Sequence, residues 1–509
     1  MYSTVRTAIP EGIETIPIGV EVDISTGLPM FDMVGSLSPE VREAKERVRT
    51  ALANSGIPLP ARRITINLSP ANVRKSGTGF DLPIAVGLLQ GLGIVEEELC
   101  RDLLFLGELG LNGSLKAVPG VLPVVADGVR QGITEFVLPL ENLREAKLVK
   151  GAKIYAFSNI GQVIEFLNGV VYEEPKLIGA DRPPAHKADF AEVNGQHFLK
   201  RACEVAASGM HNMLIVGPPG AGKTMISERM GSILPPLTEE ERMELSRIYS
   251  VCGLLDNQNA LIDERPFRAP HHTITRAGLT GGGFRPRPGE ISLAHHGVLF
   301  LDELPEFQKN HIEVLRQPLE EGEIRLTRGN HSVTYPADFL LLAAMNPCPC
   351  GFYPDMQKCR CSRAALERYI SQISQPILDR IDLCVEARAM TYNELTGTQP
   401  NESSEVIRGR VSACHQIQYE RYHGEGFLHN CQIPSSRLAE FCPLGKKEQA
   451  YMAEVFERMN LTGRSYHKIL RVARTLADME EAKEIRLKDL NEAVCYRSIT
   501  EKYWGGVRL

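Results

Sequence analysis

A chain of 509 residues is too long for a single hydrophobic core, so about three domains are expected. The formal net charge of −6 argues against a protein that coats nucleic acid through bulk positive charge, but it is compatible with a local basic strip inside a ring. No apolar run approaches the ~20 residues that cross a bilayer, and the first residues contain no apolar leader, so we expect a cytoplasmic protein without a membrane partner whose twelve cysteines are reduced thiols.

Residues 1–170 alternate short β-rich runs with helical stretches, which predicts an α/β domain. Helices are expected at 38–55 and 81–92. The turn before the second helix, RKSGTGF, contains glycines but lacks the G-K-[ST] ending of a phosphate loop, so phosphate binding is not expected there. The expected strands are 15–24, 63–68, 103–111 and 135–140.

Two polar stretches divide the rest of the chain. Residues 171–192 contain three prolines and no hydrophobic period, and residues 393–404 are similarly polar, so we interpret both as linkers. They delimit a core at 193–392 and a C-terminal region at 405–509.

A phosphate loop stands near the start of the core. An apolar run at 213–216 leads into GPPGAGKT, and an amphipathic stretch follows, which predicts a strand, a loop and a helix. The glycines let backbone N–H groups converge on the phosphate oxygens of ATP, while Lys223 would neutralise the β- and γ-phosphates and Thr224 would hold Mg²⁺. Upstream, Val193 and Gln196 are expected to contact the adenine base. The expected phosphate-binding residues are Gly217, Pro218, Pro219, Gly220, Ala221, Gly222, Lys223 and Thr224.

Two histidine pairs follow, His271 with His272 and His295 with His296. Their imidazoles are potential metal ligands. Adjacent residues of a strand point to opposite faces, however, and cannot share a metal without a turn. We therefore interpret these histidines as hydrogen-bonded or solvent-facing.

The sequence GVLFLDE at 297–303 ends an apolar run in two carboxylates, as expected of a buried parallel strand whose C-terminal edge carries the chemistry. Asp302 is expected to hold Mg²⁺, directly or through water. Glu303 is expected to polarise the attacking water, because hydrolysis requires a metal-binding carboxylate and a base.

Two β-rich runs joined by RGNH at 328–331 predict a hairpin. The next apolar strand ends at Asn346, a position suited to a sensor that orients water against the γ-phosphate. Arg325, Arg328 and His331 are candidates to face a central pore and meet DNA phosphates. Isolated surface charges are the alternative.

Four of the twelve cysteines fall within fourteen residues, at Cys348, Cys350, Cys359 and Cys361. Four thiolates can close a tetrahedral Zn²⁺ site, which would be structural because no position is left open for water. The C-x-C spacing is tighter than the usual C-x-x-C, so free thiols and a labile disulfide are the alternatives.

Arg380 lies in the sequence ILDRID, on the side of the core away from its own phosphates. There it is expected to complete the site of a neighbouring subunit, which requires a ring. The alternative is a simple ion pair with Asp379 or Asp382.

Apolar residues recur with helical spacing at 405–422, 446–459, 466–480 and 487–502, which predicts an all-helical lid. Arg464 lies at the mouth of one of these helices, where we expect it to reach the γ-phosphate when the lid closes. Arg471 is the alternative for this role.

In the first domain, GTGFDLPIAVGLL and FLGELGLNGSLKAVPGVLP resemble the Lon-protease-like domain. By this resemblance the catalytic serine and lysine positions fall at about Gly79 and Leu122, neither of which can act as nucleophile or base. A displaced pair, Ser76 and Lys75, is a minor alternative. We expect this domain to pack, to oligomerise or to hold a protein partner.

The order of these parts, with NPCPCG, LDRID and GRSYHKILRVART, resembles the branch of AAA+ ATPases that includes the magnesium chelatase motor subunit. It is similar to the YifB/ComM family, because chelatase motors lack the first domain and the cysteines. The resemblance implies an ATP-driven, hexameric DNA helicase that migrates branches during natural transformation and recombination. The residues alone imply a ring ATPase; a chelatase-like motor and a protein-remodelling ATPase acting on a protein partner are the alternatives.

Overall fold

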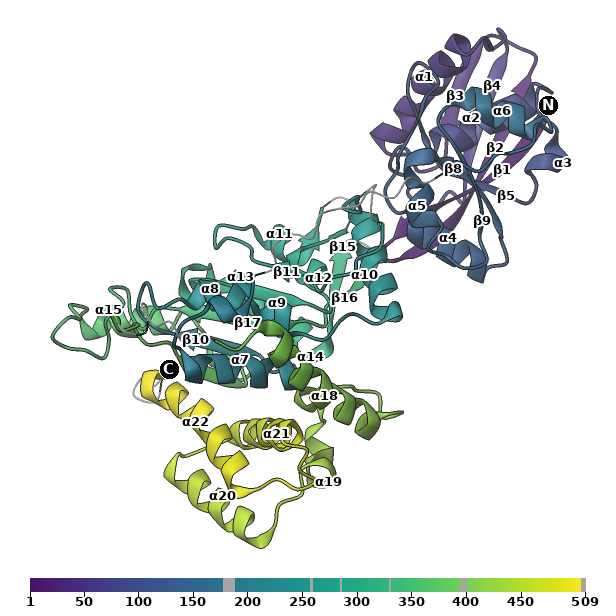
Figure 1. Cartoon of the computed structure of the whole chain (residues 1–509). Helices are drawn as coiled ribbons and strands as arrows, with labels where there is room; N and C mark the ends of the chain where they lie inside the picture. Colours follow the sequence, from purple (N-terminus) through teal and green to yellow (C-terminus); the bar gives the residue numbers. More distant parts are fainter. Residues whose placement is uncertain are drawn as a thin grey trace. The chain divides into compact units, whose positions relative to one another are not determined.

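The computed structural model describes residues 1–176, 188–256, 260–283, 286–328, 331–392, 394 and 401–504. Its contacts divide the chain into two compact units (Figure 1). The first combines Met1–Arg182 with Thr238–Asp263, and the second combines Pro183–Leu237 with Glu264–Leu509. Half of the predicted linker at 171–192 and most of that at 393–404 lie outside the described residues.

A seven-stranded mixed sheet forms the centre of the first unit, in the order β3-β4-β2-β1-β5-β8-β9. Strands β1 and β2 pair antiparallel along their whole facing length, from Tyr2 opposite Asp23 to Glu11 opposite Glu14. Their residues alternate between buried and exposed, as expected when neighbouring side chains point to opposite faces. The strands are β1 Tyr2–Glu11, β2 Glu14–Ser25, β3 Met30–Val34, β4 Arg63–Ser69, β5 Leu103–Phe105, β8 Glu135–Pro139 and β9 Lys153–Phe157, beside a small pair of β6 Glu108–Leu109 and β7 Leu115–Lys116.

Helices cover both faces of this sheet. Apolar residues of α1, α2 and α6 share one core with it, and those of α4 and α5 share a second. Helix α2 is buried nearly all round, which matches its almost wholly apolar sequence. The helices are α1 Pro39–Asn54, α2 Asp81–Gly91, α3 Glu97–Cys100, α4 Val121–Arg130, α5 Leu143–Ala146 and α6 Ile160–Leu167.

Helix α10, Glu239–Cys252, also belongs to the first unit, although it lies in sequence within the predicted core. A capping box of Thr238 and Glu241 begins the helix, and Gly253 ends it in a left-handed conformation. The helix packs against α4. The first unit is therefore built from two separate stretches of the chain.

A five-stranded parallel sheet, in the order β11-β14-β17-β10-β18, forms the centre of the second unit. Strands β10, β14 and β17 are buried throughout, as expected when helices cover both faces. The strands are β10 Met213–Val216, β11 Phe267–Arg268, β14 Val298–Leu301, β17 Leu340–Met345 and β18 Leu383–Glu386, with two separate pairs, β12 Gly281–Gly282 with β13 Arg287–Pro288 and β15 Glu323–Arg328 with β16 His331–Pro336.

The C-terminal helices share one apolar core with α7 and this sheet (Figure 1). The predicted α/β fold with a helical C-terminal region is confirmed. Around the sheet lie α7 His197–Gly209, α8 Lys223–Glu228, α9 Met230–Ile233, α11 Arg276–Thr280, α12 Glu290–Leu293, α13 Lys309–Glu313, α14 Pro318–Glu321, α15 Arg363–Ile370 and α16 Gln375–Leu378. The C-terminal helices are α18 Ser404–Tyr422, α19 Leu438–Phe441, α20 Lys446–Arg458, α21 Gly463–Met479 and α22 Leu487–Trp504.

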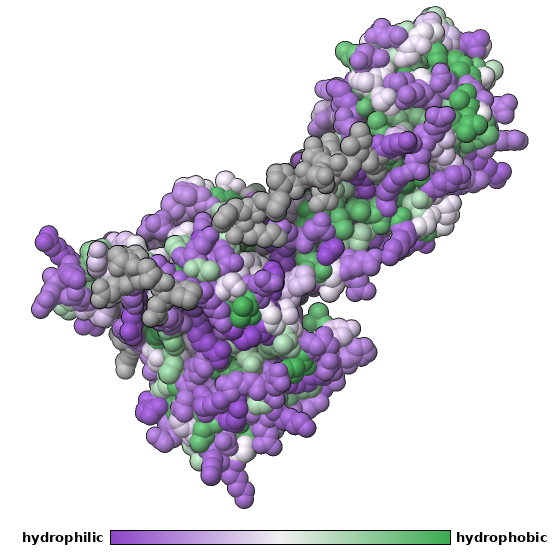
Figure 2. Space-filling view, in the orientation of Figure 1, coloured by the Kyte–Doolittle hydropathy of each residue, from purple (hydrophilic) through white to green (hydrophobic). Residues whose placement is uncertain are grey.

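The visible surface is mainly hydrophilic, with hydrophobic residues scattered over it (Figure 2). Such scattering is normal for proteins in water and marks no particular interface. Within the described part of the chain, no helix combines the length and the apolar character needed to cross a membrane.

Candidate active site

Three neighbouring strands of the parallel sheet end at one edge. Gly217 follows β10, Asn346 follows β17, and Asp302 and Glu303 follow β14. Because the carboxyl ends of parallel strands meet at the same edge, residues from three distant segments of the chain lie together there.

Lys223 is the centre of this group. Its Nζ donates to the carbonyl oxygens of Gly217 at 2.7 Å and Pro218 at 3.0 Å, and to Oδ1 of Asn346 at 3.0 Å. Burial lowers the pKa of Lys223, whereas the charges of Asp302 and Glu303 raise it. The ammonium therefore lies within the loop that would wrap a phosphate, with the predicted sensor as a direct partner.

Thr224 and Asp302 form a hydrogen-bonded pair at the same edge of the sheet. The Thr224 hydroxyl donates to Oδ2 of Asp302 at 2.7 Å. A hydroxyl and a carboxylate at this separation are the oxygen ligands that Mg²⁺ prefers, and few protein ligands are needed because Mg²⁺ keeps waters and substrate phosphates. These two residues fit the predicted Mg²⁺ site.

The predicted base, Glu303, is 56% exposed and has a left-handed backbone, with φ of 51°. Its N–H donates to Oδ1 of Asp302 at 2.9 Å. Its own carboxylate approaches His272, with Nδ1 and Oε2 3.6 Å apart. The two neighbouring carboxylates thus have different partners.

Gln196 and Val193, the residues predicted to contact the adenine base of ATP, lie beside the phosphate loop. Gln196 donates through Nε2 to the carbonyl oxygens of Ala221, at 3.1 Å, and Arg388, at 2.6 Å. Val193 is buried in the apolar core around the sheet. Gln196 therefore connects the start of α7 to the phosphate loop.

Arg380 and Arg464, the two arginines predicted to act on ATP, lie together at the edge of the sheet opposite the phosphate loop. The carbonyl of Arg380 accepts from Asn212, which immediately precedes β10, whereas the phosphate loop follows β10. The four-residue strand between them spans roughly 13 Å. Arg464 is exposed and pairs with Asp379 at 3.1 Å, beside Arg380 and not at the phosphate loop.

The side chain of Arg380 has partners within its own chain: it pairs with Glu320 and donates to the Pro376 carbonyl at 2.5 Å. Arg471, the alternative to Arg464, donates from Nε and from a terminal nitrogen to the carbonyl of Ile433, at 2.9 and 2.6 Å. Of the two lid arginines, Arg464 is the accessible one.

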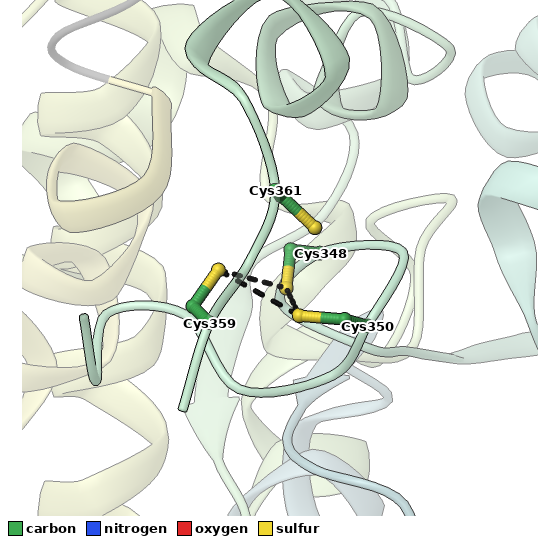
Figure 3. Close-up of side chains that lie close together, drawn as sticks. All are labelled: Cys348, Cys350, Cys359 and Cys361. Carbon is green, nitrogen blue, oxygen red and sulfur yellow. Dashed lines mark hydrogen bonds between the residues drawn. The ribbon is translucent and has the colours of Figure 1, made fainter. Parts of the chain in front are cut away.

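The four clustered cysteines converge between β17 and α15 (Figure 3). The sulfur atoms of Cys348, Cys350 and Cys359 lie 3.3, 3.8 and 3.6 Å apart, and all four sulfurs are within 4.8 Å of one another. A zinc–sulfur bond of about 2.3 Å gives tetrahedral S–S separations of roughly 3.8 Å. Backbone N–H groups of Phe352 and Arg360 lower the pKa of Cys350 to about 6, which favours the thiolate needed for a metal. The cluster therefore fits Zn²⁺.

The cysteine loop also contacts the phosphate loop. Gly351 has φ of +83°, and a Cβ atom there would lie 2.5 Å from Cδ of Pro219. Nearby, the Tyr369 hydroxyl hydrogen-bonds to the backbone of Asn346. Neither Gly351 nor Tyr369 was predicted from the sequence, and only their closeness along the chain to Asn346 and the cysteines indicates them.

Of the predicted DNA-contacting residues, Arg325 lies on β15 and donates to Oε1 of Glu323 from two nitrogens, at 2.8 and 2.5 Å. The side chains of Arg328 and His331 lie outside the described residues, although their backbones pair in the predicted hairpin.

In the first unit, Leu122 at the expected position of the Lon-type lysine and Lys75 of the alternative displaced pair are both buried. Leu122 is fully buried, and its N–H donates to Glu145 and to the Ser250 hydroxyl of α10. Lys75 is fully buried too, and its Nζ donates to the carbonyl of Pro70. Burial lowers the pKa of Lys75.

Three family models match the chain in succession. The one described as subunit ChlI of Mg-chelatase matches residues 20–142, that of magnesium chelatase, subunit ChlI, matches 189–395, and that of the ChlI C-terminal region matches 401–497. YifB of Salmonella typhimurium is 39% identical over 496 residues, which cover 97% of each chain. Competence protein ComM of Haemophilus influenzae is 38% identical over 496 residues, which cover 96% of each chain. The chain belongs to the YifB/ComM family of AAA+ ATPases.

This YifB/ComM protein also has a partial similarity to Lon protease 2 of Bacillus subtilis, 28% identical over 204 residues, or 34% of this chain and 36% of that protein. The family predicted from the motifs is thus confirmed, and the matches of the three chelatase models include residues of both units.

Proposed function

We propose that the chain is an ATP-driven DNA motor that works as a ring of identical subunits, with the branch-migrating helicase activity of the ComM type in natural transformation and recombination. One observation carries the ATPase part: Lys223, Thr224, Asp302 and Asn346 meet at one sheet edge through contacts of 2.7–3.0 Å. These are the parts that phosphoryl transfer to water requires.

In this proposal each residue has one task. Lys223 exchanges its carbonyl partners for the β- and γ-phosphates of ATP. Thr224 and Asp302 hold Mg²⁺, which neutralises charge on the phosphates. Glu303 accepts a proton from the attacking water, and Asn346 orients that water. Val193 and Gln196 hold the adenine.

Arg380 acts on the ATP of a neighbouring subunit. Arg464 was expected to reach the γ-phosphate when the lid closes, and its pairing with Asp379 beside Arg380 favours the neighbour's γ-phosphate as its target. Their place at the edge opposite the phosphate loop supports this, because the sheet separates them from the phosphates of their own chain. In the ring, Arg380 would leave Glu320 and stabilise charge on the transferring phosphoryl group, with Arg464 beside it. Six subunits are expected by resemblance.

DNA as substrate is supported by the relative named a competence protein and by its coverage of 96% of both chains. The β15–β16 hairpin, with Arg325, Arg328 and His331, is the proposed contact with DNA phosphates. The first unit is proposed to hold a protein partner or to support the ring.

We also propose that Cys348, Cys350, Cys359 and Cys361 hold a structural Zn²⁺. The metal would supply a fixed cross-link, not chemistry, because four thiolates leave no open position. Elemental analysis of the purified protein should find zinc, and a Cys359→Ser variant should lose it. Less than about half an equivalent in the wild type would count against the site.

The test of the proposed function is the rate of ATP hydrolysis with single-stranded DNA, forked DNA or an unfolded protein added. Stimulation by DNA is expected. Stimulation by unfolded protein alone would exclude the helicase and favour a remodelling ATPase. Lys223→Ala should abolish nucleotide binding, whereas Glu303→Gln should bind ATP without turnover; normal hydrolysis by either variant would refute the assigned site.

A further inference from the structure

Residues 352–356 form an exposed apolar tip on the loop that carries the four cysteines. The side chains of Phe352 and Met356 are 45% and 73% exposed. Asp355 folds the tip: its N–H donates to the Phe352 carbonyl at 2.9 Å, and its carbonyl accepts from the Cys359 N–H at 2.8 Å. The apolar tip is thus presented by a hydrogen-bonded turn.

The apolar tip adjoins the phosphate loop. Gly351, directly before it, lies so close to Pro219 that a Cβ atom at residue 351 would be 2.5 Å from Cδ of that proline. Helix α15, which follows the cysteine loop, lies at the periphery of the second unit (Figure 1). In a ring that shares its ATP sites, the phosphate-loop edge of each subunit faces a neighbour, and the tip faces that neighbour with it.

A groove on the C-terminal lid offers a matching surface. It lies between α20 and the start of α21 and has a volume of about 290 Å³. Pockets for small-molecule ligands range upward from roughly 300 Å³, so this groove suits one or two side chains better than a substrate. The rings of Phe456 and Tyr466 meet edge to face in it, with centroids 6.2 Å apart. The residues that line the lid groove are Gln449, Met452, Ala453, Phe456, Glu457 and Tyr466.

The lid groove belongs to the edge that is proposed to face a neighbour's ATP. Tyr466 and Arg464 both lie in the first turn of α21. Arg464 in turn pairs with Asp379, beside Arg380. The lid groove of one subunit and the apolar tip of the next are therefore expected on the two sides of one interface.

The charges beside the two surfaces are complementary. Arg360 follows the tip and Glu457 lines the lid groove, and both residues are exposed. Within the described part of the chain, neither side chain has an ion-pair partner. Opposite charges that meet across an interface favour the correct partner and fix the register of the contact.

We infer that the apolar tip of one subunit inserts into the lid groove of a second copy of this chain. Met356 is the anchor and packs between Phe456 and Tyr466, because a flexible thioether fits irregular gaps and attracts aromatic rings. Arg360 meets Glu457 at the rim. The inference rests on the proposed ring and identifies one of its contacts. Docking would hold the neighbour's lid arginine in register with the phosphate loop.

Sedimentation of the full chain with Mg²⁺ and ATP tests the docking, in the Glu303→Gln background so that ATP persists. Met356→Asp on the tip and Ala453→Trp in the lid groove should each raise the protein concentration of half-assembly by about five- to thirtyfold. The double variant should lose little more than the worse single variant, because both changes remove the same contact. Val406→Asp, which changes a 52% exposed apolar residue of α18, is the matched control and should assemble normally.

Two further measurements identify the contact itself. A photoreactive benzoyl-phenylalanine in place of Met356 should give covalent dimers only with ATP, cross-linked to residues 446–466 of the second chain. Arg360→Glu and Glu457→Arg should each weaken assembly, and the two changes together should restore it.

Normal assembly of folded Met356→Asp and Ala453→Trp proteins, an equal loss in Val406→Asp, or cross-links to another segment would overturn the inference and leave the ATPase proposal intact. Binding of a fluorescent ATP analogue should stay within about twofold in every variant. A loss of assembly that follows a loss of ATP binding would also overturn the inference, because the tip would then act on its own phosphate loop. Failure of the parent protein to assemble with ATP would instead defeat the proposed ring, and the docking with it.

Discussion

The buried ion pair between Lys468 and Asp382 offers a sharp test of how the lid is attached to the core. Lys468, on α21, places Nζ 3.3 Å from Oδ1 of Asp382 and donates to the Ile381 carbonyl at 2.8 Å. Both side chains are less than 10% exposed. Burial lowers the pKa of Lys468 to about 8, while Lys468 and His211 outweigh the effect of burial on Asp382 and hold its pKa well below its usual value.

Replacing Lys468 by Met removes the cation and leaves the carboxylate buried. Removing one partner of a buried pair costs about 3–5 kcal/mol. At about 2–4 °C per kcal/mol for a large domain, the melting temperature of the second unit should fall by roughly 6–20 °C. The double variant Lys468→Met with Asp382→Asn removes both charges and should recover most of this loss.

Scanning calorimetry of the full chain measures the effect. In the single variant, loss of the cation raises the pKa of Asp382, so the destabilisation should be small at a pH where this carboxyl is protonated and grow as pH rises and the carboxyl ionises. A loss below about 1 kcal/mol, or a double variant as unstable as the single one, would refute the reasoning.

Two further changes test other contacts of the structure. Gly351→Ala should weaken ATP binding, because the new Cβ would lie 2.5 Å from Cδ of Pro219 and the φ of residue 351 is +83°. Titration with a fluorescent ATP analogue measures this binding. Gly231→Ala, whose Cβ would meet no atom within 4 Å, is the control. Ser250→Ala removes a hydrogen bond of 2.6 Å to buried Glu145 and should reduce the stability of the first unit by about 1–3 kcal/mol. The loss should appear as faster hydrogen exchange of the α10 amides. Unchanged exchange would show that this contact does not hold the helix.

Much of the fold could be predicted because local pattern and structure agree. Three predicted helices agree with the structure to within two residues, because their apolar spacing or their flanking turns mark them. They are 38–55 for α1, 81–92 for α2 and 405–422 for α18. Strand β1 was missed, although its first six residues alternate between exposed and buried.

The position of α10 could not be predicted from the sequence. The helix itself is well marked by its capping box, but its docking depends on Glu145, about a hundred residues upstream. The Ser250 hydroxyl donates to Glu145 at 2.6 Å, and Asn142 donates to the same carboxylate at 2.6 Å. Such long-range polar contacts leave no periodic trace in the sequence.

In the candidate site, the motifs identified the residues that directly follow a strand, because the end of a strand fixes where the next side chains lie and the direction in which they point. The partners supplied by loops, such as His272 and Tyr369, were not identified, since a loop residue is placed by tertiary contacts. Histidine pairs were judged as possible metal ligands on the geometry of a strand, whereas His271 and His272 lie in a turn with their rings 4.0 Å apart.

ATP hydrolysis by a mixture of two inactive variants tests the central claim most directly. Lys223→Ala lacks its own phosphate contact, and Arg380→Ala lacks the group offered to a neighbour. In mixed rings a Lys223→Ala subunit can supply Arg380 to the intact phosphate loop of an Arg380→Ala subunit, so hydrolysis should return on mixing. If each variant is folded and inactive and the mixture stays inactive as well, the proposed sharing of sites between subunits is contradicted.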